Sequence, residues 1–507
     1  MDSSHISLTR VTFQYEGSHS PVFESITVRF ARGWTGLVGA NGAGKSTLLM
    51  LAAGMMAPTG GLAQTVKNTY YLEQRTDTEP GGLVELLFDY QSSAVEIKAD
   101  LGITESWHGR WDTLSHGERK RAQIGCALYA DPAVLLVDEP GNHLDADSRE
   151  RLITALRRFD GIGLIVSHDR DMLDALCDSI VFIEPPSVVK RSGTYTSASM
   201  ERAREMEHAR REYAQAKREE RRLKKEAVRR REEALRADSL RSKKGLPPRD
   251  RDARGKKNLA ILTGRDGVAG KLARIMDARL ERVSELAASL TPAKSHRLGI
   301  WFDVERSGRS FVISLPESTI PLGDGRVLRT PALAVGRSDH IGLTGRNGTG
   351  KTTLVRRIMD THDLSPDRVV YIPQEIDASS SRECLEDVLR LDNRELGMLM
   401  TIIRRLNSDP ARLFETALPS PGEIRKLLLA RGILHRPHLI VMDEPTNHLD
   451  LPSIECLEAA LADCPIALLL VSHDMRFLSR CVGSRWIFED EDDGSISVRT
   501  GDVRGPV

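Results

Sequence analysis

GLVGANGAGKSTLL, at residues 36–49, predicts the fold of this chain, and a near copy, GLTGRNGTGKTTLV, follows at residues 342–355. In both stretches an apolar run leads into a glycine-rich loop of the form G-x4-G-K-[ST], and a helix-forming run follows. Glycines let main-chain N–H groups curl around phosphate groups, and the N-terminus of the following helix adds its dipole. Each stretch is therefore predicted to be a phosphate-binding loop (P-loop) between a buried strand and a helix.

The two P-loops supply the same kinds of nucleotide-binding residue. Lys45 and Lys351 are expected to reach the β- and γ-phosphates of ATP, and the hydroxyls of Ser46 and Thr352 to bind Mg²⁺. The other predicted ATP-binding residues of the loops are Gly39, Asn41, Gly42, Gly44, Thr47, Gly345, Asn347, Gly348, Gly350 and Thr353. A chance glycine turn is the alternative interpretation, and two matches in strand–loop–helix context argue against it.

Two further motifs repeat at the same spacing as the P-loops. VLLVDEPGNHLD at 134–145 returns as LIVMDEPTNHLD at 439–450, and LIVSHD at 164–169 returns as LLVSHD at 469–474. The chain therefore contains two copies of one domain, and a separate segment lies between them.

Acidic residues end the second repeated strand of each copy. A continuous apolar run indicates a strand buried on both faces, and its carboxyl end lies at the sheet edge where α/β proteins bind ligands. Asp138 and Asp443 fit Mg²⁺ binding through water. Glu139 and Glu444 fit a general base that orients or deprotonates the attacking water. Two acidic residues that merely cap a strand are the alternative.

A histidine follows the next strand of each copy. A single histidine is more often a structural residue than a catalytic one. His168 and His473, however, each follow a strand that comes shortly after the Asp-Glu strand. We therefore expect both to lie near the γ-phosphate, as sensors or water-positioning groups.

The order of these motifs is that of a known ATPase domain. LSHGERKRA (114–122) lies between the P-loop and Asp-Glu-Pro in the first copy, and PSPGEIRKLLLA (419–430) takes the same place in the second. This order resembles the ATP-binding cassette domain, in which LSGGQ or LSGGE forms the signature loop. The resemblance implies two cassettes that close head to tail, with the signature loop of one covering the ATP of the other.

The resemblance assigns further residues to the two nucleotide sites. Signature residues of the first copy should face the nucleotide on Lys351, and those of the second copy the nucleotide on Lys45. These residues are Ser115, Gly117 and Glu118, and Ser420, Gly422 and Glu423. The family's Q-loop residues, expected to contact ATP and Mg²⁺, match Gln74 and Gln374, and its D-loop residues match Asp145 and Asp450.

The chain departs from the family pattern in ways that differ between the copies. His116 and Pro421 stand where the family has the first signature glycine. Tyr15 is expected to stack on adenine in the first copy, whereas the matching stretch of the second has no aromatic residue. Ile320 or Leu322 is expected to pack there instead. Equal turnover at the two sites is therefore left open.

The motif EP-x-NHLD in both copies is similar to that of the ABC-F subfamily, and the resemblance covers nearly the whole chain. It implies an α/β fold with two P-loop cassette domains, at residues 1–196 and 296–507. A long antiparallel α-helical hairpin linker, residues 197–295, is expected to join them.

The linker sequence itself predicts two helices. From Thr194 to Lys244, 51 residues contain no glycine and no proline and are rich in Arg, Glu, Lys and Ala, which favours one long helix. In a second helix apolar residues recur at helical spacing: Leu272, Ile275, Met276, Leu280, Val283, Leu286 and Leu290. This stripe is expected to pack against Met206, Tyr213 and Leu223 of the first helix.

The tip of the predicted hairpin, about residues 241–270, is basic. Residues 201–290 hold 27 Lys and Arg against 16 Asp and Glu, although the whole chain has zero formal net charge. A solvated helix face explains such charge along the helices. At the tip, a polyanion such as RNA is the better explanation. The predicted RNA-binding residues are Arg249, Arg251, Arg254, Lys256 and Lys257.

The ABC-F resemblance implies a partner and a function. In that subfamily the linker enters the E-site of the ribosome, and its tip approaches the P-site tRNA and the peptidyl-transferase centre. The P-loop to signature spacing is 69 residues in the first copy and 68 in the second, so we expect no inserted arm domain. The chain also ends shortly after His473, so we expect no C-terminal extension. Both features resemble the antibiotic-resistance members, which displace drugs from the 70S ribosome.

Other functions stay open at this point. The chain resembles housekeeping translation factors of ABC-F that act on stalled or idle ribosomes. An ATPase subunit of a drug exporter and a DNA-repair ATPase are less favoured. The N-terminus has no signal-peptide core, and no apolar run approaches the about 20 residues that a membrane span needs. Six scattered cysteines give no disulfide or zinc pattern. We expect a cytoplasmic monomer whose two cassettes close on each other.

Overall fold

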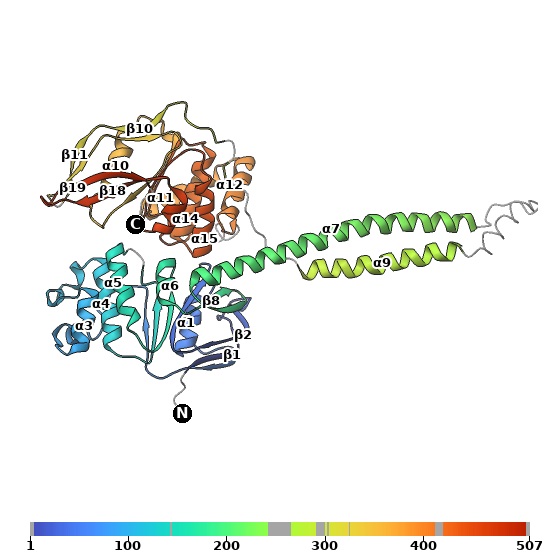
Figure 1. The fold of residues 1–507 in the computed structure, drawn as a ribbon, viewed down its shortest axis with the longest axis horizontal. Coiled ribbons are helices and arrows are strands. Elements are labelled where there is room, and N and C mark those ends of the chain that lie inside the picture. Colours follow the sequence, from blue (N-terminus) through green and yellow to red (C-terminus); the bar gives the residue numbers. More distant parts are fainter. Residues whose placement is uncertain are drawn as a thin grey trace, which may run out of the picture. The chain divides into compact units, whose positions relative to one another are not determined.

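The computed structural model describes residues 5–141, 144–241, 265–290, 300–301, 304–323, 325–410 and 419–502. Its contacts divide the chain into two compact units: Met1–Ala198 with His296–Val507, and Ser199–Ser295. The first unit holds both repeat domains, which we call the first cassette (before the linker) and the second cassette (after it). The predicted α/β fold with two P-loop domains and a helical linker is confirmed (Figure 1).

The first cassette is built on a mainly parallel sheet with the strand order β5-β6-β7-β3-β8-β9. A smaller antiparallel sheet, β2-β1-β4, packs beside it. The strands are β1 (Ile6–Phe13), β2 (Phe23–Phe30), β3 (Gly33–Gly39), β4 (Gly60–Gln64), β5 (Thr69–Leu72), β6 (Val134–Asp138), β7 (Ile162–Val166), β8 (Ser179–Glu184) and β9 (Ser187–Ser192). The α-helices are α1 (Lys45–Ala53), α2 (Leu83–Phe88), α3 (Ser92–Leu101), α4 (His116–Tyr129), α5 (Ala146–Arg157) and α6 (Arg170–Leu176).

The second cassette repeats this plan with a larger main sheet, ordered β11-β12-β19-β18-β14-β17-β16-β15, and a two-stranded sheet, β10-β13. The strands are β10 (Phe311–Leu315), β11 (Ser318–Pro321), β12 (Val327–Thr330), β13 (Leu333–Gly336), β14 (His340–Thr344), β15 (Val369–Ile372), β16 (Leu439–Asp443), β17 (Ala467–Val471), β18 (Ser484–Asp490) and β19 (Ile496–Asp502). The α-helices are α10 (Lys351–Thr361), α11 (Ala378–Leu389), α12 (Asn393–Arg405), α14 (Pro421–Leu434), α15 (Leu451–Ala462) and α16 (Met475–Cys481).

Burial on both faces explains why the central strands are apolar throughout. In β6, Val134 and Leu136 join the cluster that contains α1, whereas Leu135 and Val137 join the cluster on the other face. All five residues of β6, β7, β16 and β17 are buried. Because β3, β6 and β7 are parallel, their carboxyl ends meet at one edge of the sheet. This edge carries the P-loop, the Asp-Glu pair and the Ser-His-Asp segment.

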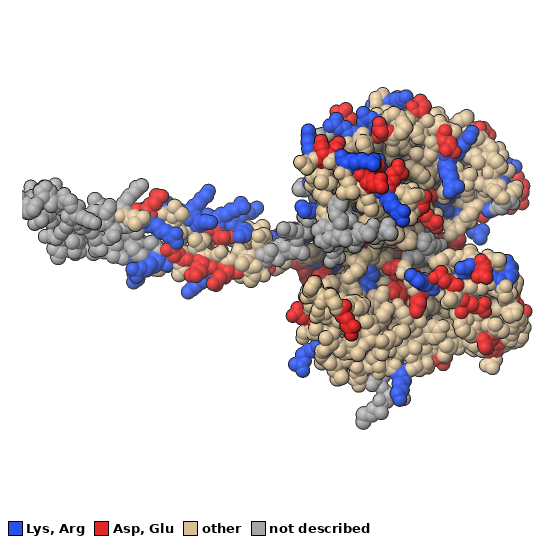
Figure 2. All heavy atoms as spheres, turned by 180° about the vertical axis from the view of Figure 1, so that it is seen from behind, with Lys and Arg blue, Asp and Glu red and all other residues tan. Residues whose placement is uncertain are grey.

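The linker contributes two long helices, α7 (Tyr195–Arg241) and α9 (Arg265–Ser289). α7 has 47 residues, which gives about 70 Å of helix at 1.5 Å per residue. The helices run antiparallel, and two ion pairs join them: Arg231 to Asp277 at 2.8 Å and Arg279 to Glu219 at 3.4 Å. Figure 2 shows basic and acidic side chains interleaved along the linker helices.

The predicted apolar seam between the linker helices is wrong in part. Leu223 is buried, as expected. Leu272, Ile275 and Leu286 are 39%, 53% and 52% exposed, so these three stripe residues do not form a buried contact. The small residues Ala216, Ala227 and Ala287 are buried instead. No described helix is both long enough and apolar enough to cross a membrane.

A glycine opposite a tryptophan fixes the packing of β3 on β7. Trp34 pairs with Gly163 in the parallel ladder, and the indole N–H donates to the main-chain oxygen of Leu156 at 3.0 Å. A Cβ atom added at Gly163 would lie 2.4 Å from the indole ring. The sheet therefore accepts no larger side chain there without moving Trp34.

We predict that Gly163→Ala destabilises the first cassette by about 1–3 kcal/mol, because overpacking a well-filled core forces side chains and backbone to shift. Thermal unfolding followed by circular dichroism should show a lower first midpoint. Gly81→Ala is the matched control, since nothing lies within 4 Å of its added Cβ. Equal midpoints for the two variants would contradict this account of the packing.

Candidate functional site

Both P-loops hold their lysine at the mouth of the loop. Lys45 Nζ donates to the main-chain oxygens of Gly39 at 3.0 Å and Ala40 at 3.3 Å. Lys351 Nζ donates to the equivalent oxygens of its own loop, each at 2.7 Å. The residue before each lysine, Gly44 or Gly350, has a φ of about +90° that favours glycine. Burial lowers the pKa of both lysines.

The hydroxyl after each lysine binds the buried aspartate at the end of the neighbouring strand. Ser46 Oγ donates to Asp138 Oδ2 at 2.7 Å, and Thr352 Oγ1 donates to Asp443 Oδ2 at 2.9 Å. Burial raises the pKa of both carboxyl groups. Hydroxyl and carboxylate oxygens are the ligands that Mg²⁺ prefers, usually together with substrate phosphates. The described residues form no cluster of three or more His, Cys, Asp or Glu suited to a metal. The donor set thus fits an ion shared with phosphate groups.

The predicted catalytic glutamates share an unusual backbone conformation. Glu139 and Glu444 have φ values of +47° and +48°, a region that non-glycine residues rarely adopt. Their main-chain N–H groups donate to Val166 at 2.9 Å and Val471 at 2.8 Å. The same rare conformation at the matching residue of both copies points to a function, because the surrounding structure must stabilise the strain.

Each glutamate lies beside its predicted histidine. Glu139 Oε1 lies 2.9 Å from His168 Nε2, and Gln74 Nε2 donates to Glu139 Oε2 at 3.1 Å. In the second cassette Glu444 Oε1 lies 3.7 Å from His473 Nε2. The structure thus brings together the predicted base, histidine and Q-loop residue of the first cassette.

The pKa values of the acid and the histidine of the second site shift in opposite directions. Burial, with the neighbouring Asp443, raises the pKa of Glu444 to about 8. Burial, with the positive charges of Lys351 and Arg149, lowers the pKa of His473 to about 4. His473 Nε2 lies 3.0 Å from Asn347 Oδ1, so the imidazole is bound to the P-loop.

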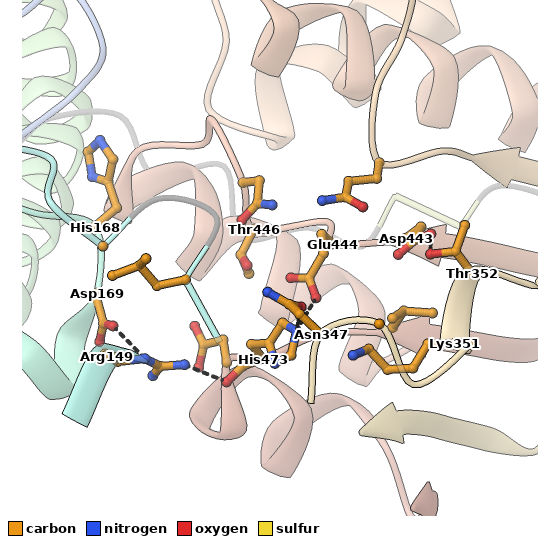
Figure 3. Close-up of a pocket in the computed structure, with 18 of the residues that line it drawn as sticks. Arg149, His168, Asp169, Asn347, Lys351, Thr352, Asp443, Glu444, Thr446 and His473 are labelled. Carbon is orange, nitrogen blue, oxygen red and sulfur yellow. Dashed lines mark hydrogen bonds and ion pairs between the residues drawn. The ribbon is translucent and has the colours of Figure 1, made fainter. Parts of the chain in front are cut away.

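A cavity of about 520 Å³ joins these groups (Figure 3). Residues of both cassettes line it. The second cassette contributes its P-loop, Asp443, Glu444 and His473. The first contributes Glu139, Arg149, His168 and Asp169. Gln374 and Leu322 also line the cavity, and their contacts with the nucleotide stay a prediction.

The D-loop of each cassette binds the P-loop of the other. Asp450 Oδ2 accepts a hydrogen bond from the main-chain N–H of Asn41 at 2.7 Å. The main-chain N–H of Asn347 lies close enough to Asp145 to help lower the pKa of that carboxyl group. The two nucleotide sites therefore lie at one interface, and each is built from both halves of the chain.

The signature residues have local partners in the structure. Ser115 and Glu118 form a reciprocal N-terminal cap of α4, and Ser420 and Glu423 form the same cap of α14. A Cβ atom at Gly422 would lie 2.6 Å from the main-chain oxygen of His448. The residues described as lining the cavity include neither signature set. Their placement over the opposite nucleotide stays a prediction.

The residues predicted to lie near adenine are partly accessible or partly buried in the structure. Tyr15 is 45% exposed, and its hydroxyl shares a hydrogen bond of 2.7 Å with Thr47 Oγ1. Ile320 is partly buried against the core of the second cassette. Neither observation tests adenine stacking. The predicted RNA-binding residues Arg249, Arg251, Arg254, Lys256 and Lys257 lie outside the described residues.

Two buried cations in the site were missed at the sequence level. Lys120 Nζ donates to the main-chain oxygens of Glu73 at 2.7 Å and Gln74 at 3.1 Å. Arg425, at the same place in the second copy, donates to the main-chain oxygens of Gln374 and Glu444. Both fix the Q-loop to the helix that follows the signature loop. Both copies have a cation five residues after the signature serine, and this shared position could have indicated the contact.

The sequence comparisons agree with this geometry. The ABC transporter family matches residues 23–142 and 328–447, one stretch in each cassette. The ribosome protection protein VmlR of Bacillus subtilis is 28% identical over 500 residues, which are 96% of this chain and 87% of VmlR. The erythromycin resistance ATP-binding protein MsrA of Staphylococcus epidermidis is 27% identical over 89% of this chain and 91% of its own. ABC transporter F family member 5 of Arabidopsis thaliana is 26% identical over 99% and 77%.

A solved structure shows the same fold. It is the crystal structure of the archaeal ribosome recycling factor aABCE1 with the ribosomal stalk protein aP1, with a TM-score of 0.60 at 19% identity. The match covers 98% of this chain and 90% of the other. Three observations agree. The two P-loop domains share an interface, one ATPase family matches both of them, and the relatives align across the linker. The chain has the twin cassettes of an ATP-binding cassette ATPase, and over most of its length it is similar to proteins that include an ABC transporter F family member.

Proposed function

We propose that the protein is a ribosome protection ATPase, which binds the 70S ribosome through its linker and displaces an antibiotic from the peptidyl-transferase centre or exit tunnel. The names of VmlR and MsrA support this proposal, because both align over most of this chain. The single observation that carries it concerns the first turn of α7, which we call the root of α7. This turn is bound at the interface between the cassettes.

The first turn of α7 binds both cassettes. Thr196 N donates to Asp174 Oδ1 of the first cassette at 2.7 Å. Arg476 of the second cassette donates to Asp174 Oδ2 at 2.7 Å and to Thr196 Oγ1 at 3.1 Å. The hydroxyl of Tyr195 donates to Glu455 Oε1 of the second cassette at 3.0 Å. A change at the interface therefore moves the start of a 47-residue helix.

The proposed cycle follows from these contacts. ATP and Mg²⁺ bind Lys45 with Ser46 and Asp138, and the second site uses the matching residues. Closure of the interface sets the root of α7 and thereby the ribosome-binding state of the linker. Glu139 and Glu444 then act as general bases toward the attacking water, and hydrolysis releases the protein. The site of action would be the cytoplasm, on a ribosome that holds P-site tRNA.

The linker surface fits a large, charged partner. α7 carries 15 Lys and Arg against 10 Asp and Glu. Several of these cations form ion pairs within α7, such as Arg211 with Glu207 at 3.1 Å and Lys217 with Glu220 at 2.7 Å. Ion pairs between exposed side chains contribute little stability, so phosphate groups can replace the acidic partners at low cost. Ile275 of α9 is 53% exposed and offers an apolar contact to such a partner.

We predict that the purified protein with ATP restores cell-free translation blocked by one structural class of antibiotic that binds the peptidyl-transferase centre or exit tunnel. A panel of such drugs, titrated against a fixed protein concentration, measures this rescue. Ribosome binding without rescue from any drug would contradict protection, and would favour a translation factor acting on stalled or idle ribosomes.

Glu139→Gln with Glu444→Gln is the matched control for this experiment. The double variant keeps the P-loops and should bind ATP, but it lacks both proposed bases. We expect it to stay on the ribosome and to inhibit translation even without drug. Rescue by this variant equal to that of the native protein would show that hydrolysis is not needed.

We predict that Arg249→Glu with Arg251→Glu and Arg254→Glu weakens ribosome binding and reduces its dependence on salt, because each lost phosphate contact lowers the salt slope by about one unit. ATP affinity should stay at the native value. Sedimentation with ribosomes at a series of KCl concentrations measures the slope. An unchanged slope would argue against phosphate contacts by these residues.

A further inference from the structure

One arginine of the first cassette reaches into the second nucleotide site. Arg149 Nη2 donates to the main-chain oxygen of His473 at 2.9 Å, and Arg149 Nε lies 3.2 Å from Asp169 Oδ2 (Figure 3). The guanidinium group therefore joins the Ser-His-Asp segment of its own cassette to that of the other. Its side chain is only 15% exposed, so water screens these contacts weakly.

The position of Arg149 is set by the start of α5. Asp145 caps this helix by accepting from the main-chain N–H of Ser148 at 2.9 Å, and it lies near the main-chain N–H of Asn347, which helps to lower the pKa of Asp145. Arg149 lies one turn further along the same helix. The start of the helix that carries Arg149 is thus next to the P-loop of the opposite cassette.

His473 is the residue that this contact orients. Its imidazole Nε2 lies 3.0 Å from Asn347 Oδ1 and 3.7 Å from Glu444 Oε1. A hydrogen bond to the main-chain oxygen of His473 restricts the peptide that carries this imidazole. Because small displacements of catalytic groups cost large factors in rate, such a restriction matters for the hydrolytic step more than for ATP binding.

The residue at the matching position of the other copy cannot make this contact. Asp145 and Asp450 occupy the same place in EP-x-NHLD, so Arg149 corresponds to Ile454. Ile454 is 1% exposed and also lines the cavity. An isoleucine side chain has no N–H group. Ile454 therefore cannot give the main chain of His168 the hydrogen bond that Arg149 gives to His473.

We propose that Arg149 is a positioning residue that the first cassette supplies to ATP hydrolysis at the Lys351 site, and that the two ATP sites are unequal for this reason. Turnover at the Lys351 site then requires the first cassette to be docked, whereas the Lys45 site turns over without a matching arginine. The proposal rests on the ATPase activity of the family and on the roles proposed for Glu139 and Glu444.

The test compares Arg149→Ile, which installs the residue of the other copy, in two backgrounds. In Glu139→Gln, where turnover is left to the Lys351 site, we expect kcat to fall about tenfold or more, with KM for ATP unchanged within about twofold. In Glu444→Gln, where turnover is left to the Lys45 site, the fall should be at least five times smaller. Arg149→Lys keeps a cationic donor and should recover part of the lost kcat in the first background.

Arg151→Ile is the matched control. It lies on the same helix, is 42% exposed and pairs with Asp147 at 3.1 Å, and it should leave kcat unchanged in both backgrounds. Equal falls for Arg149→Ile in both backgrounds would show a general loosening of the interface and overturn the proposal. So would a rise in KM that accounts for the whole loss, or no fall at the Lys351 site.

A second measurement keeps the test decisive if either glutamine background has no turnover. The full chain with native Glu139 and Glu444 is trapped with vanadate and photoreactive 8-azido-ATP, and labelled peptides are assigned to the first or second cassette. Arg149→Ile should lower trapping in the second cassette about tenfold relative to the first. An unchanged ratio of labelling would overturn the proposal without bearing on whether the protein acts on ribosomes.

Discussion

Contacts between each D-loop aspartate and the P-loop of the opposite cassette join the two cassettes. Asp450 accepts a hydrogen bond from the main-chain N–H of Asn41, and Asp145 lies close enough to the main-chain N–H of Asn347 for this group to help lower the pKa of Asp145. Both aspartates also cap the helix that follows them. One carboxyl group thus fixes a helix, a P-loop and the interface at the same time. Because a P-loop is made of main-chain N–H groups, its geometry responds directly to this contact.

Ion pairs extend from this interface to the start of the linker. Arg170 of the first cassette binds buried Glu458 of the second, and Arg476 of the second binds Asp171 and Asp174 of the first. Breaking a buried pair leaves a charge without its partner, which is costly. Separating the two cassettes would therefore cost free energy at this pair. Since Asp174 also binds Thr196, the root of α7 is fixed by the same set of contacts.

Much of the nucleotide site could be predicted from sequence, because P-loops, strand-end carboxylates and capped helices are local patterns. Lys45, Ser46 and Asp138 follow from spacing alone, and the prediction of one helix from 194 to 244 agrees with α7. Arg149 could not be predicted, since its acceptor on His473 lies 324 residues away in the sequence. The same holds for Lys120, whose acceptors are main-chain oxygens that no residue type reveals. The predicted apolar seam between the linker helices was wrong for Ile275, because an apolar stripe alone does not show which of its residues the other helix covers.

In the proposed cycle, the nucleotide state of the cassettes sets the linker through the root of α7. Pulsed electron paramagnetic resonance measures this directly, with spin labels at Leu235→Cys on α7 and Leu389→Cys on the second cassette, both largely exposed. The native cysteines are buried or partly buried, and the chain without added cysteines gives the background. The account predicts that ATP shifts the distance distribution in the Glu139→Gln, Glu444→Gln protein, and that Arg476→Ala reduces this shift. An identical distribution with and without ATP, or a full shift in the Arg476→Ala protein, would contradict it.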